Sequence, residues 1–141
     1  GGWRVLPAGA QRALGTRRGR FLGIDPSAVI PQGAAGNGVA GVRLAADGDE
    51  VIAALPVSCE NGEAILSTSE RGWKVTEVAD IPVKGRGGAG VGFHPFVSGE
   101  DAVLSASISR TGFVRNGRAV RAESRAKSSI KGSGADVTPA G

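Results

Sequence analysis

The Gly-rich stretch Gly85–Gly90 is the first part of this sequence that could bind a ligand. It satisfies the pattern G-x-G-x-x-G, which in a dinucleotide-binding fold follows a strand and opens a helix. The residues after it, Val91–Phe96, contain a proline and have no helical period, so no helix N-terminus is expected to hold a pyrophosphate and this interpretation is rejected. The stretch predicts either a plain glycine-rich turn or a loop that contacts phosphates through cations and exposed backbone N–H groups, with the residues Lys84, Gly85, Arg86, Gly87 and Gly88.

The single histidine and the single cysteine give little support to catalysis. His94 leaves a Ser-His-Asp arrangement open, but the G-x-S-x-G turn of a serine nucleophile is absent. Cys59 has the acids Glu60 and Glu63 nearby, whose charge disfavours a reactive thiolate. One Cys and one His are too few for a zinc site, and a chain without tyrosine has no tyrosine nucleophile. We expect no catalytic residue and no metal ligand in this chain.

Two acidic pairs recur at the same place in two similar stretches. Asp49-Glu50 ends a stretch that begins with Gly-Val at Gly38, and Glu100-Asp101 ends a similar stretch that begins with Gly-Val at Gly90, 52 residues later. Recurrence at a repeated place favours a structural role in turns over the paired carboxylates of a glycosidase.

The repeat extends beyond these stretches. Arg18–Leu22 matches Arg71–Val75, and Ile30-Pro31 matches Ile81-Pro82. A period near 50 residues made of short, Gly-bounded strands is typical of propeller blades, and strands of this length predict an antiparallel all-β fold. We therefore expect a partial array of two to three propeller-type blades.

The pattern also suggests boundaries within the chain. Residues 1–11 are expected to be the remnant of a preceding blade or a linker, and residues 12–108 to form two repeats, at about 12–55 and 63–107. Residues 109–141 are expected to be a decayed repeat and a flexible, disordered basic tail, because their apolar pattern stops near residue 115. The start lacks a methionine, which suggests a fragment of a longer chain.

Composition bounds the partners. The lone cysteine favours a reducing compartment, and no apolar run approaches the length of a membrane span. The net charge of +4 is divided into +5 over residues 1–46, −6 over 47–109 and +5 over 110–141. Such a layout suits a polyanion, and a surface of mixed sign is the alternative. Trp3 and Trp73 are expected in the core, with stacking on bases as the alternative.

The repeated unit resembles the C-terminal repeat of the A subunits of bacterial type IIA DNA topoisomerases, those of DNA gyrase and topoisomerase IV. The residues Thr68–Val75 resemble the Thr-x-x-Gly-x-x-Lys hairpin of that family, and Gly38–Leu44 resembles its Gly-Val-x-Gly-Ile-x-Leu strand. Residues Val83–Phe96 and Gly99–Asp101 are similar to the last repeat of the topoisomerase IV-like enzymes of actinobacteria. The family's Gln-Arg-Arg-Gly-Gly-Lys-Gly box has its nearest counterpart at Lys84–Gly90, which departs from it at three of seven positions.

The resemblance implies a β-pinwheel, a propeller variant that binds duplex DNA on a basic rim without catalysing a reaction. It implies that the catalytic Tyr and the ATPase subunit of this isomerase lie outside the chain, that ATP and Mg are used there with no cofactor here, and that the protein is cytoplasmic. The partners implied are double-stranded DNA, the ATPase B subunit, and the rest of the A subunit. A protein-interaction propeller that does not bind DNA is the rival. The cations expected to contact DNA are Arg17, Arg18, Arg20, Arg43, Arg71, Lys74, Lys84 and Arg86.

Overall fold

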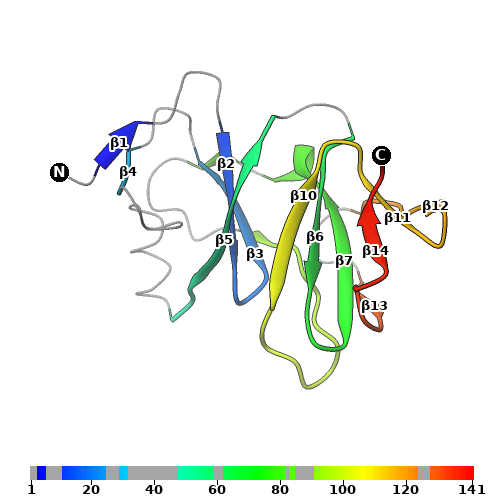
Figure 1. The fold of residues 1–141 in the computed structure, drawn as a ribbon. Helices are drawn as coiled ribbons and strands as arrows, with labels where there is room; N and C mark the ends of the chain where they lie inside the picture. Colours follow the sequence, from blue (N-terminus) through cyan, green and yellow to red (C-terminus); the bar gives the residue numbers. More distant parts are fainter. Residues whose placement is uncertain are drawn as a thin grey trace.

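The protein is built from β-strands. The computed structural model describes residues 3–5, 11–24, 29–31, 48–58, 62–81, 83–84, 91–123 and 128–141. These residues form three larger sheets, a separate pair of strands and one short 3-10 helix, η1 (Val78–Asp80) (Figure 1). The pair consists of β1 (Trp3–Val5) and β4 (Val29–Pro31). The predicted all-β, mainly antiparallel class is confirmed.

The first sheet is ordered β5-β2-β3-β8, and β9 also pairs with β3. β2 and β3 form the hairpin that contains Arg18, and β5 pairs antiparallel with β2. Two short strands from much later in the chain complete the edge of β3, β8 in parallel and β9 antiparallel. The bounds are β2 (Gln11–Thr16), β3 (Arg20–Ile24), β5 (Val51–Val57), β8 (Val83–Lys84) and β9 (Val91–Gly92).

The second sheet repeats this plan in the order β10-β6-β7-β13. β6 and β7 form the hairpin that contains Arg71, and β10 pairs with β6 as β5 pairs with β2. The bounds are β6 (Ala64–Thr68), β7 (Gly72–Glu77), β10 (Ser105–Ser109) and β13 (Ile130–Lys131).

The edge of the second sheet is completed in the same register as that of the first. Arg20 and Trp73 occupy matching places in the two hairpins, and they pair with Gly92 of β9 and Ile130 of β13. Three residues further on, Gly23 pairs in parallel with Val83, and its counterpart Thr76 makes a parallel bridge with Glu123. In both sheets the following unit of the chain therefore supplies the edge.

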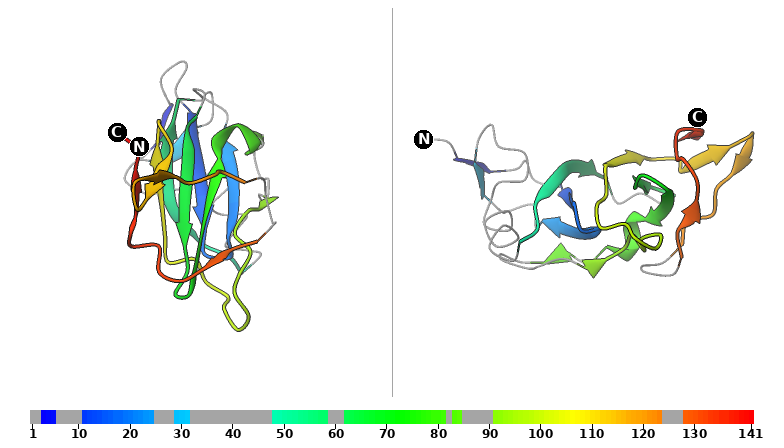
Figure 2. Two further views of the ribbon diagram at one scale, coloured as in Figure 1. Left: turned by 90° about the vertical axis from the view of Figure 1, so that its right-hand side faces the viewer. Right: turned by 90° about the horizontal axis from the view of Figure 1, so that it is seen from below.

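The C-terminal segment is ordered strand where the sequence suggested a flexible tail. β11 (Phe113–Arg115), β12 (Arg118–Ala119) and β14 (Val137–Pro139) form the third sheet, in the order β12-β11-β14. Seen from below, this sheet lies at the end of the molecule opposite β1 and β4 (Figure 2). The expectation of a disordered tail is wrong for the described residues, because Phe113 and Val137 are buried against the second sheet and few apolar residues are needed for that contact.

The second sheet is covered on both faces. Ile65 belongs to a core with Ala13, Phe21 and Phe93 on the side of the first sheet. Alternate residues of the same two strands, among them Leu66, Trp73 and Val75, belong to a second core with Phe113 and Val137. Neighbouring residues of a strand point to opposite faces, so burial of both faces leaves β6 and β7 almost entirely inside. The core position expected for Trp73 is confirmed, and the side chain of Trp3 lies outside the described residues.

The carbonyl of Gly19 links the first sheet to the segment that runs on toward the second. It accepts hydrogen bonds from the N–H groups of Phe93 (2.8 Å) and His94 (3.1 Å). Gly19 has a φ of +82°, and an added Cβ would lie 2.9 Å from the His94 Cβ and 3.1 Å from its carbonyl oxygen. Only a residue without a side chain fits this turn and this contact.

We expect Gly19→Ala to lower the free energy of unfolding by about 3 kcal/mol, because it adds left-handed backbone strain to a clash with fixed backbone. Chemical denaturation of the purified protein measures this. The matched control is Gly92→Ala in β9, where an added Cβ meets nothing within 4 Å. We expect the control to stay within about 1 kcal/mol of wild type, and equal losses in the two variants would contradict the role of Gly19.

Candidate nucleic-acid interface

Both hairpin turns are fixed by a carboxylate from the loop before the outer strand. In the first sheet, Asp49 Oδ1 accepts from the backbone N–H groups of Arg18 (3.0 Å) and Glu50 (2.8 Å). In the second sheet, Glu100 accepts from the N–H of Arg71 (2.6 Å). We call these two arrangements, Arg18 with Asp49 and Arg71 with Glu100, the hairpin clasps. They confirm the structural turn role predicted for the acidic pairs.

A glycine before each acid completes the clasp. Gly48 and Gly99 have φ values of +80° and +88°, which place each acid at the end of a left-handed turn. A Cβ on Gly48 would lie 3.1 Å from Nη2 of Arg18, and one on Gly99 would lie 3.3 Å from Nη2 of Arg71. Each guanidinium therefore lies over a glycine of the neighbouring loop, and the two turns present arginine in the same way.

The Glu100 clasp has more hydrogen bonds than its counterpart. Oε1 also accepts from the Ser69 hydroxyl (2.8 Å) and from the Val97 N–H (3.1 Å). Desolvation raises the pKa of Glu100, but the hydrogen bonds from Ser69, Arg71 and Val97 and the charge of Arg71 outweigh it, so the pKa lies below its usual value. Glu100 is thus held as a carboxylate that fixes backbone.

The structure separates the expected cations into exposed, paired and buried groups. Arg18 and Arg71 are exposed at their turns, and Arg20 is half-buried. Arg17 Nε forms an ion pair with Glu50 at 3.4 Å. The remaining expected positions, apart from Lys74, have side chains outside the described residues or lie there entirely, namely Arg43, Lys84, Arg86 and the loop glycines Gly85, Gly87 and Gly88.

Lys74 is buried, so the expectation that it contacts DNA is wrong. Its side chain faces the first sheet, because Trp73 and Val75 on either side of it face the third. It is 3% exposed, and Nζ donates to the Phe93 carbonyl at 2.7 Å and lies 5.9 Å from the centroid of the Phe93 ring. The ammonium therefore stabilises the junction of the two sheets and does not reach a ligand at the surface.

His94 lies beside Lys74 and pairs with Ser67. Nδ1 of His94 is 2.7 Å from the Ser67 hydroxyl, and that hydroxyl is 3.5 Å from the Lys74 carbonyl. Ser67 is 0% exposed and His94 is 5% exposed, so no substrate reaches this Ser-His pair. Burial lowers the pKa of His94 to about 4, with the charge of Glu100 raising it and that of Lys74 lowering it. The pair is a polar part of the core and gives no support to a hydrolase.

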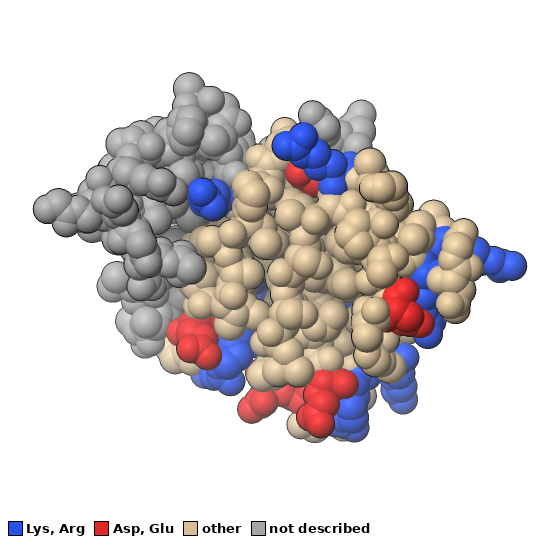
Figure 3. Space-filling view, viewed as in Figure 1, with Lys and Arg blue, Asp and Glu red and all other residues tan. Residues whose placement is uncertain are grey.

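The surface view shows where charge gathers. The lower edge of the molecule, at which the hairpin turns lie in Figure 1, has cations beside acids (Figure 3). A second basic area lies over the third sheet, where Arg115 is paired with Asp136 at 2.9 Å. Sequence reasoning assigned Lys131 to the tail and so missed that it lies next to the Arg71 turn, opposite Gly72 in the strand pairing.

The comparisons with known proteins agree with this architecture. The family described as "DNA gyrase C-terminal domain, beta-propeller" matches residues 13–58 and 65–91, just over half of the chain. This chain belongs to that family. Each of its two longer sheets corresponds to one unit of the propeller, and the third to a shorter unit.

Relatives place this propeller domain among topoisomerase subunits. Topoisomerase subunit TopoM of Mycolicibacterium smegmatis is 78% identical over 136 residues, which are 96% of this chain and 19% of that protein. The DNA gyrase protein of Deinococcus deserti that carries the same domain, its A subunit, is 38% identical over 81 residues, 55% of this chain and 10% of that protein. The chain thus spans about a fifth or less of the curated relatives it matches.

A solved structure shares the fold. The crystal structure of the C-terminal domain of DNA topoisomerase IV aligns with a TM-score of 0.55 over 82% of this propeller domain and 39% of that chain, at 13% identity. In the part of the propeller domain that the structure describes, no three His, Cys, Asp or Glu side chains come together as a metal site. No helix among the same residues has the length and apolar character needed to cross a membrane.

The buried His94 predicts a pH dependence of stability. Its pKa is about 4 in the folded protein and near 6.5 when unfolded, so the unfolded state binds more protons between these values. Stability is therefore full above pH 6.5 and decreases as the pH falls toward 4. We expect melting temperatures of His94→Gln, measured from pH 8 to pH 5, to fall less than those of wild type. Parallel curves for the two proteins would show that His94 does not stay neutral in the fold.

Proposed function

We propose that this propeller domain is the non-catalytic DNA-binding part of a type II DNA topoisomerase, within its A subunit. It contacts the phosphates of duplex DNA and thereby tunes supercoiling or decatenation by the whole enzyme. The catalytic tyrosine, the use of ATP and Mg, and the ATPase subunit itself belong to other parts of that enzyme. Family membership and the presence of related sequence in topoisomerase subunits support this assignment.

The observation that carries the proposal is the pair of hairpin clasps. Each clasp holds an exposed arginine at a turn, and the two turns lie at the same edge of the molecule. A repeated cation on a rigid turn suits the phosphate backbone, which repeats its charge regularly and is contacted without regard to sequence.

The bonding of the clasps leaves the arginine charges in place. The oxygens of Asp49 and Glu100 that form the clasps accept backbone N–H groups, and Nη2 of Arg71 donates to the uncharged Ser98 carbonyl at 2.6 Å. Arg17 differs, since its side chain is paired with Glu50. Arg18 and Arg71 are therefore the stronger candidates for phosphate contact, and Arg17 the weaker one.

We expect Arg18→Ala and Arg71→Ala each to weaken binding of the full-length protein to a linear duplex. Each change removes one cation, so the slope of log K against log salt becomes shallower by about 1. Fluorescence anisotropy at several salt concentrations measures the slope. Lys74→Met is the matched control, because it removes a positive charge that is buried, and its slope is expected to equal that of wild type.

Two results would contradict the proposal. Wild-type affinity that is flat between low and moderate salt would show that phosphate neutralisation does not drive binding. Unchanged affinity in the Arg18→Ala, Arg71→Ala double variant would favour a protein-interaction propeller. Circular dichroism melts show whether Lys74→Met remains folded, and Lys74→Arg replaces it as the control if it does not.

A further inference from the structure

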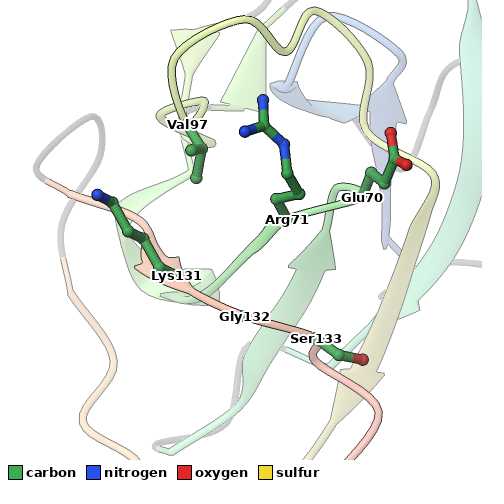
Figure 4. Close-up of a pocket in the computed structure, with 6 residues that line it drawn as sticks. All are labelled: Glu70, Arg71, Val97, Lys131, Gly132 and Ser133. Carbon is green, nitrogen blue, oxygen red and sulfur yellow. The ribbon is translucent and has the colours of Figure 1, made fainter.

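A hollow of 410 Å³ lies at the junction of the Arg71 turn and the C-terminal segment. One wall is made by Glu70 and Arg71 at the hairpin turn, and Val97 lies near the other end. The segment after β13 makes the remaining wall with Lys131, Gly132 and Ser133. Figure 4 shows Arg71 between Lys131 and Glu70, with all three side chains extending from neighbouring stretches of backbone.

The hollow exists because two equivalent loops differ in size. β9 and β13 pair with matching places in the two hairpins, so the chain leaves both strands at the same position. In the first sheet the exit residues are Phe93–Phe96, whose rings pack over the turn at Gly19. In the second sheet the exit residues are Lys131–Gly134, whose small side chains leave the same position open and add one cation.

The wall that carries Lys131 is fixed to the hairpin. Gly132 N–H donates to the Arg71 carbonyl at 3.0 Å. An added Cβ on Gly72 would lie 2.9 Å from the Ser129 hydroxyl, and one on Gly134 would lie 2.8 Å from the Thr68 methyl group. These two glycines let the C-terminal segment lie directly against the hairpin, so Lys131 is held beside Arg71 by packing on either side.

The charges of the hollow favour an anion. Arg71 and Lys131 are both exposed, and Nη2 of Arg71 uses one of five guanidinium N–H donors for Ser98. The carboxylate of Glu100 is engaged by backbone N–H groups and Ser69. Glu70 is the one acid among the residues that line the hollow, and it lies on the side of Arg71 away from Lys131 (Figure 4).

We propose that this hollow binds one phosphate group of a nucleic-acid backbone, held between Arg71 and Lys131. The inference rests on the proposed DNA-binding function and assigns to the C-terminal segment a part in it. A fork of guanidinium donors and a neighbouring ammonium are the groups that commonly contact phosphate oxygens. Position on the same edge as the hairpin turns makes the hollow continuous with the contacts of Arg18 and Arg71.

The test uses the full-length protein and a blunt linear duplex, with affinity measured from low to moderate salt. We expect Lys131→Ala to make the salt slope shallower by about 1 and to weaken binding about tenfold near 0.1 M salt. Ser133→Trp fills the hollow without changing the charge, and we expect a similar loss. Glu70→Gln removes the one lining acid and is expected to strengthen binding. The matched control is Arg118→Ala, the loss of an exposed cation on β12.

The outcomes separate this inference from the function on which it rests. If wild type binds with a steep salt dependence but Lys131→Ala and Ser133→Trp bind as wild type does, the hollow is not a phosphate site and the proposed function stands. An equal loss in Arg118→Ala would reduce the effect to net charge and also overturn the site. If inorganic phosphate perturbs the Ser133 amide in wild type but not in Lys131→Ala, while DNA affinity is the same in both, the occupant is free phosphate and the inference fails.

Discussion

The rest of the structure depends on the bonds that the short segment Phe93-His94 makes to two sheets at once. Its N–H groups donate to the Gly19 carbonyl of the first hairpin, and its Phe93 carbonyl accepts from Lys74 of the second. The Phe93 ring packs on Phe21 with centroids 5.6 Å apart, and the His94 ring reaches Ser67. A lysine, a histidine and a serine are buried at this point because they satisfy a segment that has no sheet partner of its own.

The acidic middle of the sequence has a structural explanation. Asp49 and Glu100 hold hairpin turns, and Glu63, at 2% exposed, accepts from the N–H and hydroxyl of Ser58. These carboxylates bind backbone that lacks a strand partner, so much of the negative charge of residues 47–109 faces inward or lies in turns. The exposed arginines at the turns are therefore compensated less than the net charge of that region suggests.

Local chemistry was predictable from the sequence, and burial by distant segments was not. The repeat placed Arg18 and Arg71 at equivalent turns and assigned Asp49 and Glu100 to turn structure, because Gly-acid and Arg-Gly turns form from neighbouring residues. Lys74 follows the alternation of a half-exposed strand, and nothing near it in sequence shows that a third sheet covers the other face. The C-terminal segment was misjudged for the same reason, since Val137 needs only the surface around Trp73 to be buried.

The supply of each sheet edge by the following unit has a consequence for synthesis on the ribosome. A nascent chain that has emerged only as far as residue 110 contains β6, β7 and β10, but the edge of β7 is unpaired until Glu123 and Ile130 follow. An unpaired edge is a site for pairing with other chains. Translation order and folding order therefore run out of step by one unit, and a pause or truncation before residue 130 leaves a nearly complete molecule with one open and adhesive strand.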